Sequence, residues 1–207
     1  MKTTIIIPHK HGKMNDQCLE LNLIMLKENT TIQYDVIIDD GPEDPYLIWN
    51  KQTAKIDSDV VIFTNTDVLF APEWDIMVKY AVPNSIVTGY LVECNAIGVH
   101  RTNIPMNFGQ KPETFRRKDF EEFAKKHAQL VPEIKEERGW YMPCALDRKW
   151  FVSTGGFDMS RGSFSVEPLD IYFWEECLKN PDFKLFRAKS YAYHFQNLSN
   201  ETRCQRK

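Results

Sequence analysis

The chain has 207 residues, of which 43% are hydrophobic, 27% charged and 13% aromatic. These values are typical of a soluble globular domain with one sizeable core, and they exclude a disordered chain. The net charge is -3, so no global positive field favours a nucleic-acid partner. We see no apolar run of the ~20 residues that span a bilayer, and no secretory signal. The five cysteines are widely scattered, which predicts reduced thiols in a cytoplasmic protein.

Strand and helix patterns alternate along the first half of the chain. Short β-branched, apolar runs predict buried strands at residues 3–8, 34–38, 59–63 and 86–92. Apolar spacing predicts helices at residues 16–28, 45–56 and 72–81, the first with Asp16 as its cap. This alternation indicates an α/β fold with a Rossmann-like, mostly parallel sheet flanked by helices.

The second half of the chain is less regular. Residues 95–118 read as a long loop, and residues 118–130 as an amphipathic helix. A strand at 140–146, a glycine turn at 155–158, a helix at 167–178 and an extended segment at 183–195 follow. We expect one domain over residues 1–195, with a nucleotide-binding half (1–94), a small irregular acceptor-side half (95–195) and a polar tail at 196–207.

Polar clusters follow three of the predicted strands, where each strand ends. They are His9-Lys10-His11, Asp39-Asp40-Gly41 and Asn65-Thr66-Asp67. In open α/β sheets, ligands bind beyond the carboxyl ends of the strands, so these clusters predict one shared binding crevice. Each cluster taken alone could also be a capped turn or a solvated loop.

The residue types in these clusters suit a nucleotide and a metal ion. A departing nucleotide diphosphate is best neutralised by Mg²⁺ or Mn²⁺ held by few carboxylates. Asp67 directly follows an apolar strand, and Asn65 offers a neutral oxygen to the same side. Asp39 and Asp40 follow the second strand, where acidic residues contact nucleosides in other nucleotide-binding folds.

Seven ordered segments together resemble the family 2 glycosyltransferases with the GT-A fold. They are IIIP at 5–8, VIIDDG at 36–41, NK at 50–51, VVIFTNTD at 60–67, RKWFVSTGGFD at 148–158, EPLD at 167–170 and YHF at 193–195. The resemblance covers about residues 3–195 except for 95–138. It implies a GT-A fold and a metal-dependent transfer of a sugar from a nucleotide-sugar donor to an acceptor hydroxyl.

The resemblance also implies roles for residues on the donor side. Pro8 and the residues after it, including His9, would border the donor base. Asp39 or Asp40 would contact the nucleoside, and Asn50 and Lys51 would lie near the ribose or the phosphates.

The metal and the sugar have their own expected residues. Asp67 would be the main ligand of Mn²⁺ or Mg²⁺, with Asn65 beside it. His194 would be a further metal ligand, although it could equally be a structural strand histidine. Gly155 and Gly156 would shape the pocket of the donor sugar and the acceptor.

Two positions depart from the family pattern. Asn65 stands where the family has the first aspartate of its metal motif, and Pro168 stands where the family has its catalytic aspartate. The base would then be Glu167 or Asp170, two carboxylates at the opening of a predicted helix, where the ionised form is favoured. Glu167 is slightly preferred because it stands first in the motif, and both could instead cap the helix.

Three functional interpretations follow. The first is an inverting glycosyltransferase whose acceptor is a glycan, a lipid-linked compound or another hydroxyl compound. The second is a non-catalytic nucleotide-binding or sugar-binding protein of the same fold, which Asn65 and Pro168 favour. The third is a sugar nucleotidylyltransferase, but such enzymes need a glycine-rich loop after the first strand, and this loop has one glycine, Gly12.

Overall fold

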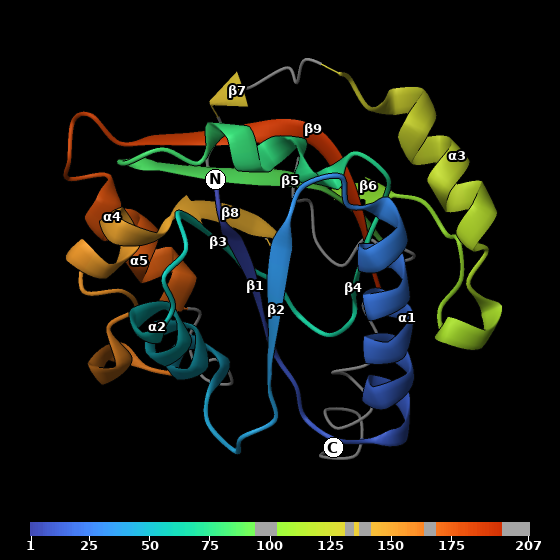
Figure 1. Cartoon of the computed structure of the whole chain (residues 1–207), viewed down its shortest axis with the longest axis horizontal. Coiled ribbons are helices and arrows are strands. Elements are labelled where there is room, and N and C mark those ends of the chain that lie inside the picture. Colours follow the sequence, from blue (N-terminus) through green and yellow to red (C-terminus); the bar gives the residue numbers. More distant parts are fainter. Residues whose placement is uncertain (94–102, 131–134, 137–141, 164–168, 196–207) are drawn as a thin grey trace.

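The structure is a computed structural model that describes residues 1–93, 103–130, 135–136, 142–163 and 169–195. Within these residues, nine strands form one sheet in the order β2-β1-β3-β8-β5-β9-β4, with β6 beside β5 and β7 beside β9 (Figure 1). The strands are β1 Thr3–Pro8, β2 Tyr34–Asp39, β3 Val60–Phe63, β4 Val68–Phe70, β5 Ser85–Glu93, β6 Asn103–Pro105, β7 Lys135–Glu136, β8 Cys144–Asp147 and β9 Lys184–His194.

The sheet is mixed, so the prediction of a mostly parallel sheet is wrong. β1 pairs in parallel with β2 and β3, and β5 pairs in parallel with β9. Between these groups, β8 runs antiparallel to both β3 and β5. At the end of the order, β4 runs antiparallel to β9. The alternation of strands and helices in the first half of the chain correctly indicates parallel strands there, but it contains no signal for strands that return from the second half.

The helices flank this sheet. They are α1 Lys13–Asn29, α2 Pro45–Lys55, α3 Arg117–His127, α4 Arg148–Ser153 and α5 Leu169–Cys177, with 3₁₀ helices η1 Trp74–Tyr80, η2 Pro112–Thr114 and η3 Met159–Arg161. Within the helix expected at 72–81, only Trp74–Tyr80 is helical, and it forms a 3₁₀ helix. The tail at 196–207 and residues 95–102 of the expected 95–118 loop lie outside the described residues; the rest of that loop contains β6, η2 and the first residues of α3.

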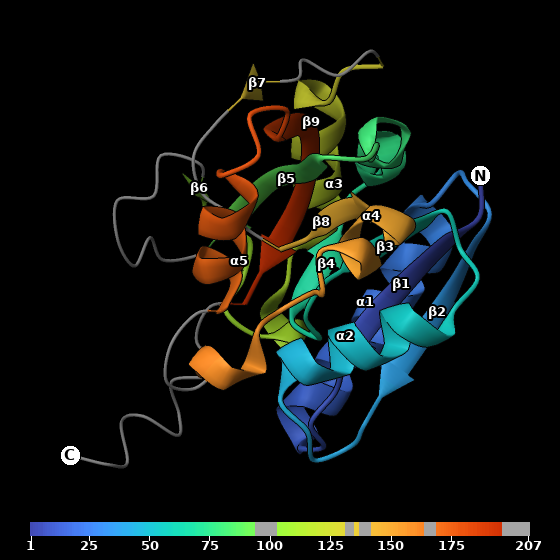
Figure 2. The ribbon, with the colours of Figure 1, turned by 90° about the vertical axis from the view of Figure 1, so that its left-hand side faces the viewer.

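Two apolar layers hold the helices to the sheet. On one face, Trp49 of α2 and Phe151 of α4 pack around Phe63 of β3. On the other face, Leu26 of α1 and Trp74 of η1 pack against the sheet. Figure 2 shows α2 and α4 on one side of β1–β3, with α1 behind them. The sheet is thus covered on both faces, as the sequence predicts.

Strand β2 differs from its prediction as a buried strand. It lies at the end of the sheet order, and its residues are half-buried except for Asp35 and Ile38, which are exposed. Ile38 remains 41% exposed. The apolar run predicts the strand but cannot show that it lies at the edge of the sheet, where a partner strand covers only one side.

Helix α1 also begins differently from its prediction. The helix starts at Lys13, and the residue before it, Gly12, makes no side-chain cap. Asp16 lies in the first turn, and its carboxylate contacts His9 and His11 instead of capping the helix. The helix therefore begins one turn earlier, and Asp16 is available to the polar cluster after β1.

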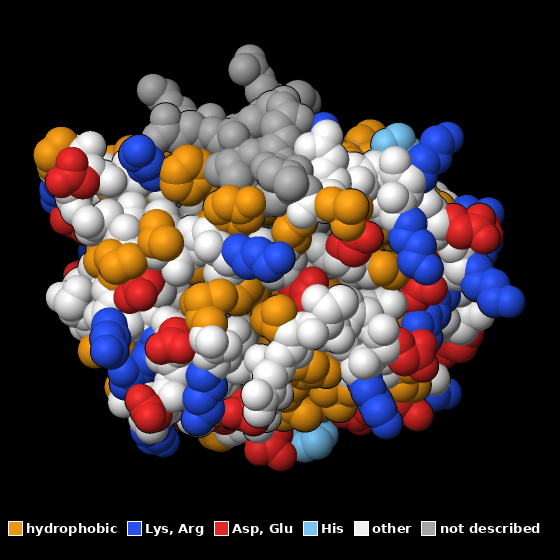
Figure 3. All heavy atoms as spheres, turned by 45° about the horizontal axis from the view of Figure 1, so that its top comes forward, with side chains coloured by type: hydrophobic (Ala, Val, Ile, Leu, Met, Phe, Trp, Pro, Cys, Tyr) orange, Lys and Arg blue, Asp and Glu red, His pale blue; other side chains and the backbone are white. Residues whose placement is uncertain are grey.

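The length of the helices and the distribution of surface charge describe what the molecule presents to its surroundings. None of the helices in the described part of the chain is long and apolar enough to cross a membrane. On the face shown in Figure 3, basic and acidic side chains are interspersed over the described surface.

Candidate functional site

The carboxyl ends of β1 and β3 are tied together by one side chain. The hydroxyl of Thr66, in the turn after β3, donates to the carbonyl of Pro8 at 3.0 Å. On the other side of this turn, the Asn22 amide of α1 lies 3.4 Å from the carbonyl oxygens of Asn65 and Thr66. These contacts fix the turn that leads directly to Asp67.

Asp67 and His194 lie next to each other at the strand ends. In the antiparallel pairing of β4 and β9, Val68 is opposite His194, so Asp67 comes one residue before this pair. His194 Nε2 is 3.4 Å from Asp67 Oδ2, and the two side chains are 23% and 19% exposed. The two residues that the sequence proposes as metal ligands thus meet at a partly open position.

A third residue, Glu93, completes this group. Its carboxylate accepts a hydrogen bond from His194 Nδ1 at 2.7 Å, and its side chain is 4% exposed. Burial opposes a charge on the imidazole, but the carboxylates of Asp67 and Glu93 outweigh this effect and raise the pKa of His194 to about 10. His194 is therefore held in one orientation with Nε2 directed to Asp67.

The donor atoms of this group fit a divalent ion of the Mn²⁺ type. Carboxylate oxygen suits Mn²⁺ and Mg²⁺, whereas imidazole nitrogen suits the transition metals, so a mixed pair suits Mn²⁺ better than Mg²⁺. Adjacent ligands of an octahedral ion lie roughly 3 Å apart, given metal–ligand distances of about 2.1 Å. The 3.4 Å between Asp67 Oδ2 and His194 Nε2 is close to this value. Glu93, bonded to the other ring nitrogen, is the kind of outer partner that metal-binding histidines have.

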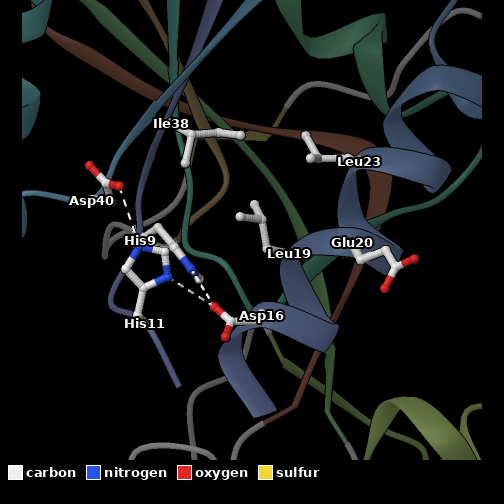
Figure 4. Close-up of a pocket in the computed structure, with 8 residues that line it drawn as sticks. All are labelled: His9, His11, Asp16, Leu19, Glu20, Leu23, Ile38 and Asp40. Atoms are coloured by element: carbon white, nitrogen blue, oxygen red, sulfur yellow. Dashed lines mark hydrogen bonds and ion pairs between the residues drawn. The ribbon is translucent and has the colours of Figure 1, made fainter. Parts of the chain in front are cut away.

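An open pocket lies between the β1–α1 loop and the edge strand β2. It has a volume of about 690 Å³, which is the size of a small-molecule site. Leu19, Leu23 and Ile38 form an apolar surface there, with polar side chains around it (Figure 4). The polar lining residues are His9, His11, Asp16, Glu20 and Asp40.

The two histidines of the β1–α1 loop converge on Asp16. Asp16 Oδ1 is 2.8 Å from His9 Nε2 and 3.3 Å from His11 Nδ1. The hydrogen bond from His9, followed by weaker effects, lowers the pKa of Asp16. The hydrogen bonds to Asp16 and Asp40 raise the pKa of His11. His9 itself is 4% exposed, so it contributes to the pocket mainly through this network.

The two aspartates after β2 have different surroundings. Asp39 accepts from the Gly41 amide at 3.0 Å and from the Gln52 side chain at 2.5 Å, so its oxygens hold the turn. The Asp40 side chain is 68% exposed and lies at the pocket, 3.3 Å from His11 Nε2. Between the two residues proposed for the nucleoside, Asp40 is the one that faces the pocket.

Asn50 and Lys51 lie on α2, away from this pocket's lining. The Asn50 amide donates to the Phe157 carbonyl at 2.8 Å and accepts from the Phe157 amide at 2.9 Å. Both of its polar atoms therefore hold the loop that contains Gly155 and Gly156. Lys51 is exposed and pairs with Glu43. The structure thus places Asn50 beside the Gly155–Gly156 loop and Lys51 on the surface of the helix.

Asp170 lies in the first turn of α5, and Glu167 lies outside the described residues. The Tyr46 hydroxyl donates to Asp170 Oδ1 at 2.7 Å. Burial raises the pKa of Asp170, and the hydrogen bonds from Tyr46 and from backbone amides only partly oppose this effect. A raised pKa brings a carboxylate closer to the range in which it accepts and releases protons near neutral pH.

Sequence reasoning missed three residues of these groups. Glu93 directly follows an apolar strand, as Asp67 does, and that position was a usable signal. Asp16 was identified but interpreted as a helix cap. Tyr46 looks like a core aromatic residue, because most of its ring packs against Trp49 and Phe157; its hydrogen bond to Asp170 has no sequence signal.

Comparisons with known proteins give a structural match only. No protein-family model matches the sequence, and no curated protein matches it. Among solved structures, the crystal structure of GalNAc-T7 with UDP, GalNAc and Mn²⁺ matches with a TM-score of 0.61 and 12% identity over 94% of this chain. The chain spans 43% of the GalNAc-T7 chain. At this identity the match shows a shared fold, and it agrees with a GT-A-like architecture for this chain.

Proposed function

We propose that this chain is a glycosyltransferase that moves a sugar from a nucleotide-sugar donor, with Mn²⁺ held by Asp67 and His194. The observation that carries the proposal is the Asp67–His194–Glu93 group at the strand ends. The fold adds support, because GalNAc-T7, which shares it, was crystallised with UDP and Mn²⁺. A UDP-sugar is therefore the first donor class to test.

Each residue of the metal group has a separate task in this proposal. Asp67 and His194 bind the ion, and Glu93 fixes the imidazole through its Nδ1 hydrogen. Asn65, two residues earlier in the chain, would supply a neutral side-chain oxygen to the same ion. When bound, the ion neutralises the charge that develops on the departing diphosphate.

The pocket beside the β1–α1 loop is the proposed place for the nucleoside. Its apolar surface, formed by Leu19, Leu23 and Ile38, suits the face of a base, and Asp40 can accept a hydrogen bond from a base or a ribose hydroxyl. His9 connects this pocket to the metal group, since its Nδ1 lies 3.5 Å from the hydroxyl of Thr66, the neighbour of Asp67. Pro8 lies at the same junction.

The proposed base is one of the two carboxylates near the start of α5. Asp170 is supported by its half-buried position, its hydrogen bond from Tyr46 and a pKa that burial raises. Glu167 remains the other candidate from the sequence. Either carboxylate would remove the proton from an acceptor hydroxyl as that oxygen attacks the anomeric carbon, which gives inversion. Gly155 and Gly156, in the loop held by Asn50, would border the donor sugar and the acceptor, which is a glycan, a lipid-linked compound or another hydroxyl compound.

Asn65 and Pro168 favour one alternative, a nucleotide-binding or sugar-binding protein without catalysis. Replacement of a charged ligand by an amide lowers metal affinity, and proline removes the usual base. The alternative shares the binding step with the main proposal and lacks the chemistry. Measuring nucleotide release from UDP-sugars in the presence of Mn²⁺ separates them, because only the enzyme hydrolyses or transfers its donor.

The binding step is tested by melting temperature against UDP, GDP, ADP, CDP and TDP, each with and without Mn²⁺. A ligand of the native state stabilises it by about 2.7 kcal/mol at 100 times its dissociation constant. We expect a Mn²⁺-dependent shift with one nucleotide that Asp67→Ala abolishes. Asp119→Ala is the matched control, since it removes an exposed carboxylate on α3. No shift with any nucleotide, or an equal loss in both variants, would contradict the proposal.

A further inference from the structure

His9, His11 and Asp16 offer potential metal-binding atoms at a position different from the Asp67–His194 pair. One nitrogen of each histidine and one oxygen of Asp16 all lie within 4.8 Å of one another. Asp16 Oδ1 is 2.8 Å from His9 Nε2 and 3.3 Å from His11 Nδ1. The ligand atoms of a tetrahedral Zn²⁺ site lie about 3.3 Å apart, because each is about 2.0 Å from the ion. The two distances to Asp16 are therefore close to those around a bound ion, and the two histidine nitrogens lie within 4.8 Å of each other.

The outer contacts of both histidines give an independent indication. A metal-binding histidine almost always donates its remaining ring N–H to an oxygen acceptor. With His9 Nε2 directed at Asp16, its Nδ1 lies 3.5 Å from Thr66 Oγ1. That hydroxyl already donates to the Pro8 carbonyl, so its oxygen is free to accept. The contact with Thr66 therefore fixes the orientation of the His9 ring, with Nε2 directed at Asp16.

His11 has the complementary arrangement. Its Nδ1 is directed at Asp16, and its Nε2 lies 3.3 Å from Asp40 Oδ2. A carboxylate bonded to the far nitrogen of a histidine orients the ring and makes it a stronger ligand. In Figure 4 both rings turn toward Asp16, and Asp40 lies on the outer side of His11. Each histidine therefore has one nitrogen for an ion and one oxygen partner for the other nitrogen.

The position of the ligands also suits a stable site. His9 is 4% exposed and is fixed at the end of β1, while Asp16 is fixed in the first turn of α1. The short loop between them is held by the Asn15 side chain, which donates to the Lys10 carbonyl at 2.8 Å. Three carboxylates, Asp16, Glu20 and Asp40, line the pocket around the two imidazoles, so the charge there favours a cation.

We propose that His9, His11 and Asp16 form a second metal site, which binds a Zn²⁺-class transition-metal ion and is separate from the Asp67–His194 pair. Two imidazoles and one carboxylate match the ligand set of three-ligand zinc sites, in which a fourth position stays open. The softer nitrogen ligands favour Zn²⁺ or Co²⁺ over Mg²⁺. The site joins β1 to α1 at the edge of the pocket. The inference does not depend on the proposed transferase activity.

The test measures Co²⁺ and Zn²⁺ binding by equilibrium dialysis of the full chain. Asp67→Ala serves as the background, because it removes the carboxylate of the other candidate site. We expect one ion per chain in this background, with affinity lowered more than about 100-fold by a further His11→Ala change. The His11 side chain is 70% exposed, so its removal does not threaten folding. His127→Ala is the matched control, an exposed histidine on α3.

Two further variants separate ligation from surface charge. Asp16→Asn keeps the size of the side chain but removes its negative charge, so it should weaken Co²⁺ and Zn²⁺ binding as His11→Ala does. Thr66→Val removes the oxygen behind His9 and should lower affinity about 10- to 100-fold. Equal Co²⁺ binding by the His11→Ala and His127→Ala variants would overturn the proposal. Since nucleotide-dependent melting shifts are measured separately, a failure here differs from a failure of the proposed function.

Discussion

His194 Nε2 lies 3.4 Å from Asp67 Oδ2, and this proximity depends on the register between β4 and β9. Because side chains alternate between the two faces of a strand, a slip of one residue would turn His194 away from Asp67. The same strand pairs His194 with Glu93 of β5. The two registers together therefore build the proposed metal group from three distant parts of the chain.

If Asp67 and His194 bind one ion, their substitutions should not be additive. Each of Asp67→Ala and His194→Ala should remove most of the Mn²⁺-dependent stabilisation by nucleotide, and the double variant should lose little more. Residues that share one ligand show coupling energies of about 0.5–3 kcal/mol in such a cycle. The measurement is the melting temperature with UDP and Mn²⁺. Fully additive losses would mean that the two residues act independently. His127→Ala controls for the loss of a histidine.

The affinity for Mn²⁺ should rise with pH. The pKa of His194 is raised to about 10 without metal, so the imidazole is protonated at neutral pH and must lose its proton to bind an ion. Below this pKa we expect the affinity to increase about tenfold per pH unit, with one proton released per ion. Titration calorimetry in buffers of different ionisation enthalpy measures both quantities.

Glu93→Gln supplies the control for this pH dependence. Removal of the Glu93 charge should lower the pKa of His194, so the affinity should reach its plateau at a lower pH than in the unchanged protein. Glu176→Gln is the matched variant, because Glu176 is an exposed glutamate paired with Lys179. A plateau that stays at the same pH in Glu93→Gln would show that Glu93 does not hold the proton on His194.

Alanine substitutions at Gly155 and Gly156 should differ in their effect on stability. Both glycines have positive φ, +86° and +70°, so alanine costs roughly 1–2 kcal/mol at either position. At Gly155 a Cβ meets open space, but at Gly156 it would lie 2.3 Å from Asn50 Oδ1. The Asn50 amide would then leave the Phe157 backbone, at a further cost of about 1–3 kcal/mol.

Urea denaturation measures this difference as the free energy of unfolding. Asn50→Ala removes the Asn50 side-chain atoms within 3.0 Å of the added Cβ and leaves Phe151 Cζ at 3.3 Å, so in that background Gly156→Ala should cost only slightly more than Gly155→Ala. Equal destabilisation by the two glycine substitutions in the unchanged protein would show that the loop moves freely away from α2.

The sequence points to the parts of the candidate site that are local. A strand that ends in a polar residue is visible in the order of residues, so the sequence alone offers Asp40, Asp67 and the β1 loop as candidates, and their roles stay predictions. Pairing between distant strands is not visible in this way. The contact of Glu93 with His194 depends on β5 lying beside β9 in one particular register.

The sequence alone also does not show which partners the polar side chains contact. Asn50 has the residue type of a donor-site amide, yet both of its polar atoms bond the Phe157 backbone. Asp16 has the residue type of a helix cap, yet it binds two histidines because the helix begins earlier at Lys13. In both cases the residue type indicates a polar contact, but the position of the neighbouring loop determines which group the side chain contacts.

The pH profile of the reaction should depend on Tyr46 if Asp170 is the base. A base must be ionised, so kcat/KM falls as the pH drops through its pKa, and burial already raises the pKa of Asp170. The Tyr46 hydroxyl donates to the carboxylate and favours its ionised form. Tyr46→Phe removes this donor, so the pKa should rise further and the acid limb should move to higher pH.

Donor turnover measured from pH 4 to 9 tests this shift, with Tyr34→Phe as the control because Tyr34 lies at the opposite end of β2 from the pocket. Asp170→Asn should abolish the acid limb together with most of the activity. If Tyr46→Phe leaves the limb in place while Glu167→Gln removes activity, Glu167 is the base. The hydroxyl of Tyr46 would then serve only to satisfy a half-buried carboxylate near the Gly155–Gly156 loop.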